Sequence, residues 1–460
     1  MPLPPGPRLA PPLQLVGLFS RPGAFLERCR ARYGDVFTLR MPGTEPMVFL
    51  GDPDLVKTVW SRDRDNGLPT GRRITLQPVL GPRSVLLQEG AEHLRRRRLM
   101  LPPFHGDRMR RYGELIDEIT LRDLRGWPVG EPFALQPRMQ SITRDGILRA
   151  VFGTREGPRE DALRRSIDDV LVRTTRTPTQ VAVLLAEASG ARHTPFHRAV
   201  RRMDALLYEE IGDRQAAGDL DARDDILSML VQARDEGGRP LEAAELRDQL
   251  VTLLLAGHET TATALAWAFD ALFRSPAVLA RLRASLTEND RYLDAVVEET
   301  LRIRPTVHDV GRRLGAPLAL PGGGALEAGT AVFASVWLLH RRPDLFPEPR
   351  AFRPERFLGD RRPSTYAWIP FGGGMRRCLG AAFAQFEMRR VLRTVLEHAD
   401  LRPATASAEG LERRPVTVVP RTGTRAILAR TPGQLVGSAT AASYAAPVAP
   451  AGAAGAGCAP

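Results

Sequence analysis

The sequence predicts a mainly α-helical protein with a few short β-strands. Apolar residues recur at helical spacing in several long segments, of which residues 241–273 form the longest uninterrupted one. Short runs of β-branched and aromatic residues, such as 36–39 and 47–50, are separated by turn residues and predict strands. With 460 residues and 43% hydrophobic content, the chain can bury a large core.

Composition narrows the class of protein. Cys29, Cys378 and Cys458 are the only cysteines, and their wide spacing predicts neither a disulfide framework nor a zinc site, which favours a reducing, cytoplasmic setting. We find no signal peptide pattern and no run of about 18 apolar residues, so we expect no membrane anchor. The net charge of +12 comes almost entirely from arginine, which favours an acidic partner but also fits a GC-rich genome. No motif indicates nucleic-acid binding.

The first third of the chain is predicted as follows. Residues 1–20 form a proline-rich N-terminal segment, extended over 1–12. A helix over 22–33 ends at Gly34 and carries Cys29, which we interpret as an ordinary surface or half-buried thiol. Strands follow over 36–39 and 47–50, a helix begins at 52–54, and 62–82 form a long loop.

Helices dominate the remainder. They are predicted over 134–152 (closed by Gly153), 160–185, 196–216, 241–273 and 289–303, with strands near 330–333. Residues 415–430 are expected to form a final hairpin with its turn at 422–424. The segment 434–460 is rich in Ala, Gly and Pro and is expected to be a disordered tail.

A glycine-rich turn followed by a cysteine, residues 371–380, is the most distinctive local pattern. A thiolate is a soft ligand suited to iron, and glycines let the backbone approach a flat cofactor closely. A helix is expected from about 379 to 396, so Cys378 precedes its N-terminus, where free N–H groups favour the thiolate. A buried structural cysteine is the alternative.

Polar residues interrupt the centre of the helix predicted over 241–273, which is otherwise apolar on all sides. Gly257 within a helix costs about 1 kcal/mol relative to alanine, and Glu259 is costly to bury without a partner. Local rules broken inside a well-formed helix indicate a functional site. A polar pair that bends the helix is the alternative. His258 faces another side and is interpreted as structural.

Both patterns resemble motifs of the cytochrome P450 family. The family's haem-binding loop reads Phe-x-x-Gly-x-Arg-x-Cys-x-Gly, and its fixed positions are filled here by Phe371, Gly374, Arg376, Cys378 and Gly380. The family's oxygen-binding helix is matched by Ala256, Gly257, Glu259 and Thr260. The resemblance implies one large domain over 21–433 with haem b held by the thiolate of Cys378.

The resemblance also implies roles around the haem. Ala256 and Gly257 would border the groove that accepts O2, and two catalytic residues, Glu259 and Thr260, would deliver protons to it. The propionates would be bound by His93, Arg97, Arg312 and Arg376. A solvated basic helix is the alternative for the first two.

Further residues resemble supporting parts of the family's fold. An ion-paired trio, expected to support the haem loop without taking part in catalysis, consists of Glu299, Arg302 and Arg356. His308 and Asp309 stand where the family usually has apolar pocket residues. They are predicted either to contact a polar group of the substrate or to pair with each other.

The resemblance implies a haem-thiolate monooxygenase that inserts one oxygen atom from O2 into a lipophilic terpene, steroid, fatty acid or polyketide. Electrons would come from a separate acidic ferredoxin and its reductase, docked on a monomer near Arg95, Arg96, Arg98 and Arg377. The alternatives are an H2O2-driven peroxygenase and a non-enzymatic haem-thiolate binding protein. Glu259 and Thr260 speak against both, because neither needs a proton-delivery pair.

Overall fold

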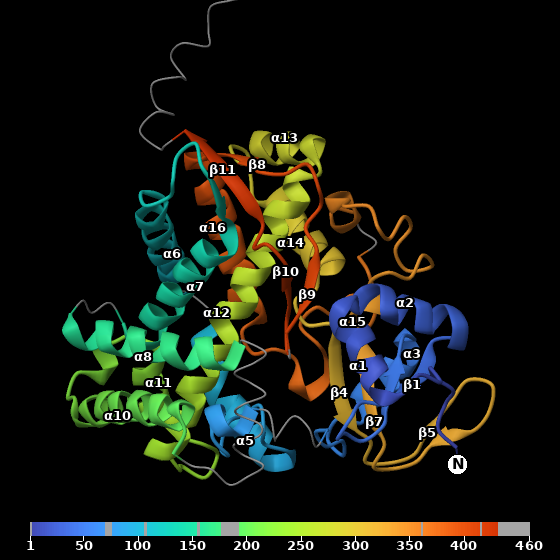
Figure 1. Cartoon of the computed structure of the whole chain (residues 1–460). Coiled ribbons are helices and arrows are strands. Elements are labelled where there is room, and N and C mark those ends of the chain that lie inside the picture. Colours follow the sequence, from blue (N-terminus) through green and yellow to red (C-terminus); the bar gives the residue numbers. More distant parts are fainter. Residues whose placement is uncertain are drawn as a thin grey trace, which may run out of the picture.

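Helices make up most of the computed structural model, which describes residues 2–69, 76–104, 108–153, 157–175, 193–359, 362–414 and 416–430 (Figure 1). The helices with defined bounds are α1 (Pro11–Ser20), α2 (Pro22–Tyr33), α3 (Pro53–Ser61), α5 (Gly90–Met100), α6 (Arg108–Leu124), α7 (Leu135–Phe152), α8 (Pro158–Thr175), α10 (Pro195–Ala216), α11 (Ile226–Gln232), α12 (Ala243–Phe273), α13 (Pro276–Ser285), α14 (Arg291–Ile303), α15 (Val336–Leu339) and α16 (Ala381–His398). The mainly α-helical prediction is confirmed.

Short strands complete the fold in small sheets. They are β1 (Val36–Leu39), β2 (Met47–Leu50), β3 (Pro132–Ala134), β4 (Asp309–Arg313), β5 (Leu318–Ala319), β6 (Ala325–Leu326), β7 (Ala331–Ser335), β8 (Asp400–Pro403), β9 (Leu411–Arg413), β10 (Val418–Pro420) and β11 (Arg425–Arg430). The largest sheet has the order β1-β2-β7-β4, in which β2 and β7 run parallel and the other pairs antiparallel. It lies with α1, α2, α3 and α15 at the right of Figure 1.

The central helix is α12, and the main hydrophobic core surrounds it (Figure 1). A capping box formed by Glu242 and Glu245 satisfies backbone N–H groups at its start. Most of its apolar residues are buried, and Leu250 and Phe269 completely so. It packs against α7, α14 and α16. This packing carries residues 255–260 through the interior of the protein.

Predicted helices and strands are reproduced closely. The helix over 22–33 ends at Gly34, whose φ of +84° only glycine adopts readily, and the helix over 134–152 is closed in the same way by Gly153. Asp52 caps α3 with its carboxylate, 2.9 Å from the N–H of Leu55. Predictions for 176–185 and 434–460 lie outside the described residues.

Several local predictions are wrong. Residues 62–82, expected to form one long loop, contain a helical segment at 76–80. Cys29, expected at the surface or half-buried, is buried because its face of α2 packs into a core cluster with Phe25 and Leu26.

Residues 415–430 do not form one hairpin: β10 pairs with β9, and β11 pairs with β3 and β8. The N–H of Arg414 donates to the carbonyl of Thr417 at 2.8 Å, and β10 then pairs with β9 ahead of the expected turn. Residues 11–12, expected to be extended, begin α1, because proline is tolerated in a first helical turn.

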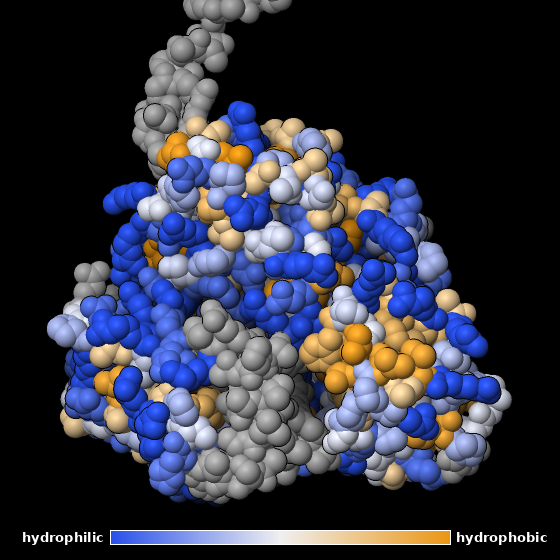
Figure 2. Space-filling model, viewed as in Figure 1, coloured by the Kyte–Doolittle hydropathy of each residue, from blue (hydrophilic) through white to orange (hydrophobic). Residues whose placement is uncertain are grey.

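An exposed apolar cluster lies near the N-terminal end of the protein. Exposed apolar side chains gather on and beside α1, the orange area at the right of Figure 2: Leu9, Leu13, Leu15 and Val16. Within the described part of the chain, no helix combines the length and apolar character needed to cross a membrane.

Candidate active site

The loop that carries Cys378 has a backbone only glycine can supply. Gly372 and Gly374 both have a φ of +65°. A Cβ atom on Gly373 would lie 2.2 Å from the Trp60 ring, and one on Gly374 would lie 2.2 Å from Oδ2 of Asp63. The loop therefore lies directly against the end of α3, and larger residues are excluded at these positions.

Cys378 is open to solvent on one side and surrounded by protein on the others. Its backbone N–H donates to the carbonyl of Phe371 at 3.0 Å, which closes the turn. Burial raises the pKa of the thiol, whereas a hydrogen bond from the Gly380 N–H and the charges of Arg97 and Arg377 act in the opposite direction. The predicted helix follows as α16, with Gly380 at its N-cap. Phe371 is half-buried and meets Trp368 edge to face at 6.3 Å.

Helix α5 docks on the same loop through two predicted residues. The ring nitrogens of buried His93 lie 2.9 Å from the carbonyl of Val85 and 3.3 Å from that of Met375. Burial lowers the pKa of His93, and nearby Arg376 lowers it further. Arg97 donates to the carbonyl of Arg377 at 2.5 Å. The structure thus brings His93, Arg97 and Arg376 together beside the cysteine loop.

Arg312 lies on β4 and is almost completely buried. It donates to both carboxylate oxygens of Asp63 at 2.6 and 2.9 Å and to the carbonyl of Gly373 at 3.1 Å. Asp63 thereby neutralises much of its charge. The sequence prediction included Arg312 but not this carboxylate partner, and the pair holds β4, the end of α3 and the glycine loop together.

The predicted oxygen-binding stretch forms an opening in α12. Ala256 is exposed and Thr260 half-buried, although the turns before and after them are buried. Residues 256 and 260 are four apart and share one face of the helix. The Thr260 hydroxyl donates to the carbonyl of Ala256 at 2.7 Å, and a Cβ on Gly257 would lie 3.4 Å from Ile147. The centre of α12 is therefore left partly uncovered on this face.

Glu259 is buried and doubly partnered on the neighbouring face. Gln140 of α7 donates to one carboxylate oxygen at 2.5 Å, and Arg414, which follows β9, donates to the other at 2.9 Å. The Arg414 side chain is 26% exposed, so this ion pair reaches from the interior to solvent. His258 is buried with its ring 3.0 Å from the carbonyl of Leu254, as expected of a structural residue.

The predicted trio is formed. Arg302 donates to the two oxygens of Glu299 at 2.6 and 2.8 Å, and both side chains are completely buried. Arg356, in the short helix Pro354–Phe357, donates to Glu299 at 3.3 Å. Arg302 also donates to the carbonyl of Ala351. The trio therefore fixes the segment that precedes the cysteine loop.

His308 and Asp309 do not pair with each other. The His308 ring lies against Trp337, with 4.6 Å between centroids, and neither ring nitrogen has a partner among the described residues. Asp309 instead accepts from Arg413 at 2.8 Å. Of the two predicted alternatives, mutual pairing is therefore wrong, because an arginine from β9 is the stronger partner for the carboxylate. Contact with a polar group of the substrate stays a prediction.

The arginines expected on the docking surface differ in exposure. Arg95 is bound to Asp235 and Glu245, and Arg96 to Glu245, with side chains 14% and 7% exposed. The expectation that these two face a partner is therefore wrong, because acidic residues before and within α12 neutralise them. Arg98 and Arg377 are exposed.

One buried acid was missed by the sequence interpretation. Glu387 lies on the apolar face of α16, four residues from both Phe383 and Val391. Burial raises its pKa well above the usual range, and a hydrogen bond with Thr261 acts in the opposite direction. A carboxyl group on an apolar helix face was the signal that could have revealed it.

The donor set fits a flat, dianionic iron cofactor. One thiol opens beside a glycine turn, and cationic side chains gather around that turn from α5, β4 and the loop itself. Thiolate suits iron, and arginine forms charge-assisted hydrogen bonds to carboxylates. These features define the class of haem-thiolate proteins.

Comparisons with known proteins agree with this class. The family model for cytochrome P450 matches residues 2–424. Cytochrome P450 135B1 of Mycobacterium tuberculosis is 43% identical over 435 residues, covering 92% of this chain and 91% of the relative. Cytochrome P450 137 of the same species is 38% identical, with 86% and 83% coverage.

Solved structures agree as well. The retinoic acid-bound cyanobacterial CYP120A1 has a TM-score of 0.79 at 25% identity, covering 93% of this chain and 99% of the other. The cytochrome P450DA haem domain has a TM-score of 0.78 at 23% identity and shares the fold, covering 94% and 98%. The chain belongs to the cytochrome P450 family. It is a haem monooxygenase with a proximal cysteine thiolate, which uses O2 and a redox partner on hydrophobic substrates.

Proposed function

We propose that Cys378 is the proximal ligand and that His93, Arg97, Arg312 and Arg376 hold the haem propionates. The observation that carries this proposal is the open thiol in a loop contacted directly by three of these side chains. When bound, haem supplies reductive activation of O2. Phe371, Gly374 and Gly380 shape the turn that carries Cys378.

The test is an optical spectrum of the dithionite-reduced protein under CO. Wild type is expected to show the strongly red-shifted Soret band of thiolate-ligated haem, and Cys378→Ala is expected to lose it. Cys29→Ala is the matched control, because Cys29 is buried on α2. A histidine-type spectrum in wild type, or an unchanged spectrum in Cys378→Ala, contradicts the assignment.

We propose that Glu259 and Thr260 deliver protons beside the O2 groove at Ala256 and Gly257. The Glu259–Arg414 ion pair supports this, because it connects a buried carboxylate to a partly exposed arginine. General acid–base residues contribute about 10²–10⁴-fold. Glu259→Gln is therefore expected to slow substrate oxidation at least about 100-fold.

A matched variant separates this role from helix packing. Thr260→Val is expected to divert electrons into H2O2, measured as the ratio of peroxide formed to substrate oxidised. Thr263→Val, one turn further along α12, is the control, because its buried hydroxyl has no partner among the described residues. Equal peroxide yields from the two variants would contradict the proposal.

We propose a lipophilic substrate of the terpene, steroid, fatty acid or polyketide type. The exposed face of Ala256 adjoins apolar Ile147, which lies beside Gly257, and this favours an apolar ligand there. One structural neighbour holds retinoic acid, which is itself lipophilic. Titration with a panel of these four classes should give a saturable Soret shift for one of them. Saturation only by polar ligands would contradict this proposal.

We propose that the electron donor is an acidic ferredoxin with its reductase, docked near Arg98 and Arg377 on a cytoplasmic monomer. Both arginines are exposed, and the chain carries a net charge of +12. The double reversal Arg98→Glu/Arg377→Glu is expected to slow reduction by ferredoxin and to weaken its dependence on salt. Arg402→Glu, at an exposed site on β8, is the control. Turnover with H2O2 alone, at the rate of the complete chain, would favour a peroxygenase. Haem without turnover under either condition would favour a binding protein.

A further inference from the structure

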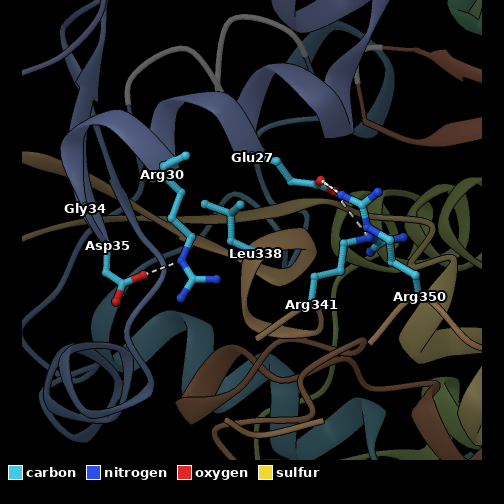
Figure 3. Close-up of a pocket in the computed structure, with 8 residues that line it drawn as sticks. Glu27, Arg30, Gly34, Asp35, Leu338, Arg341 and Arg350 are labelled. Atoms are coloured by element: carbon cyan, nitrogen blue, oxygen red, sulfur yellow. Dashed lines mark hydrogen bonds and ion pairs between the residues drawn. The ribbon is translucent and has the colours of Figure 1, made fainter. Parts of the chain in front are cut away.

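A pocket of about 440 Å³ opens between α2 and the segment from α15 to Arg350 (Figure 3). None of its lining residues belongs to the cysteine loop, α5 or α12. They are Glu27, Arg30, Ala31, Gly34, Asp35, Leu338, Arg341 and Arg350. Cavities of about 300–1,000 Å³ hold small molecules, so this pocket is large enough for one.

Arg341 forms the inner wall, and its side chain is only 8% exposed. Its guanidinium lies 3.0 Å from the centroid of the Trp337 ring, and Nη2 donates to the carbonyl of Ile303 at 2.6 Å. Its buried Nη1 has no hydrogen-bond partner among the described residues. Because a buried, unpaired N–H group is costly, an acceptor atom brought next to Nη1 would be stabilised.

The carboxylate of Glu27, which lies nearest to Arg341, has other hydrogen-bond donors and does not fully neutralise the arginine. Glu27 accepts from Arg350 at 2.6 Å and lies 3.6 Å from Nε of Arg341 (Figure 3). It also accepts from the indole N–H of Trp337 at 3.0 Å. Burial lowers the pKa of Arg341 well below its ordinary value, and nearby Arg304 lowers it further, against the single opposing charge of Glu27. The positive charge of Arg341 on the inner wall is therefore only partly neutralised by Glu27.

The outer wall offers no spare negative charge. Asp35 accepts from Arg30 at 2.6 Å and from Arg342 at 2.8 Å, so two arginines already share it. Ala31 and Leu338 supply apolar surface between the charged groups. The Arg350 side chain is 81% exposed and can turn from Glu27 towards a bound anion.

We propose that this pocket binds a small organic anion. A carboxylate or phosphate group lies between Arg341 and Arg350, and a short apolar body lies against Ala31 and Leu338. Arginine recognises both kinds of oxyanion through two parallel hydrogen bonds. The site is independent of the proposed haem and substrate roles, since it shares no residue with them.

Calorimetric titration of the haem-loaded protein at constant ionic strength tests the proposal. The probes are inorganic phosphate and butyrate, with chloride as the balancing salt. Saturable binding of at least one probe is expected, and its preference separates a phosphate from a carboxylate ligand. Arg350→Gln is expected to weaken binding at least about ten-fold, because it removes a charge-assisted hydrogen bond to the anion. Arg402→Gln is the matched exposed control and should bind as wild type does.

Trp337 fluorescence gives a second readout. Because the Arg341 guanidinium lies on the Trp337 ring, binding should change the emission of wild type, and Trp337→Phe should abolish that change. Absence of saturable binding for both probes overturns the proposal. Wild-type affinity in Arg350→Gln, or an equal loss in Arg402→Gln, overturns it too, because the first excludes Arg350 and the second indicates screening of overall charge.

Discussion

Replacing Glu299 with glutamine should destabilise the protein strongly, because it leaves a buried cation without its anion. Glu299 and Arg302 are both completely buried and joined by two hydrogen bonds of 2.6 and 2.8 Å. The same carboxylate accepts from the backbone N–H of Arg353 at 2.8 Å. Arg302 cannot move to water, since it also donates to the carbonyls of His340 and Pro349 at 2.8 Å.

The magnitude follows from this geometry. Breaking a buried ion pair by removing one partner costs about 3–5 kcal/mol. Glutamine keeps the shape and one acceptor oxygen, so we expect the lower half of that range, about 3–4 kcal/mol. With an m-value of about 3 kcal/mol/M in urea, the unfolding midpoint should fall by about 1 M.

The assay is urea unfolding followed by circular dichroism, together with haem retention. Glu348→Gln is the matched control: it breaks the exposed pair with Arg353, whose side chains are 68% and 48% exposed, and should cost less than about 1 kcal/mol. Replacing both buried partners, Glu299→Leu with Arg302→Met, should recover part of the loss. The reasoning is refuted if Glu299→Gln costs no more than Glu348→Gln.

Three further predictions concern the cysteine loop, the buried carboxyl group of Glu387 and the buried thiol of Cys29. Gly374→Ala should lower haem content, measured as the ratio of Soret to protein absorbance, because its Cβ would displace Asp63; Gly218→Ala, whose Cβ would meet open space, should not. Burial raises the pKa of Glu387 well above its usual range, so the folded chain keeps it neutral while the unfolded chain ionises above about pH 4.5. The free energy of unfolding therefore decreases as pH rises above about 4.5. Glu387→Gln should be more stable than wild type at pH 7 but not at pH 4, as measured by the urea concentration at the midpoint of unfolding. Burial also raises the pKa of Cys29 to about 11 from 9.0, so stability is full below pH 9 and falls between pH 9 and 11. Cys29→Ala should remove about 2–3 kcal/mol of that fall, and identical pH profiles would contradict it.

The elements that the sequence predicts well are those with a local cause. The apolar run of α12 and the glycines that close α2 and α7 lie in single continuous segments, so period and composition suffice. The cysteine loop could be predicted equally well, since its cysteine, arginine and glycines lie within ten consecutive residues, 371–380.

Residues whose significance depends on distant partners were missed. Asp63 meets Arg312 across 249 residues, and Arg414 meets Glu259 across 155, and nothing in either local sequence indicates the pairing. The same limitation explains the error at Arg95, which resembles a surface cation until Asp235 is placed beside it. The strand pairing near the C-terminus was predicted wrongly for a related reason, because β11 pairs with β3 and β8, which lie earlier in the chain.

The docking of α5 on the cysteine loop has a consequence for synthesis. His93 meets the carbonyl of Met375, which is 282 residues later in the chain. At about 5–20 residues per second, a ribosome reaches that partner about 14–56 s after it has made the helix. At the start of this interval the growing polypeptide has His93 and Arg97 of the proposed haem site but lacks Arg312, Arg376 and Cys378. The cofactor can therefore be bound by all of its proposed ligands only near the end of translation, and truncated products should leave the ribosome without it.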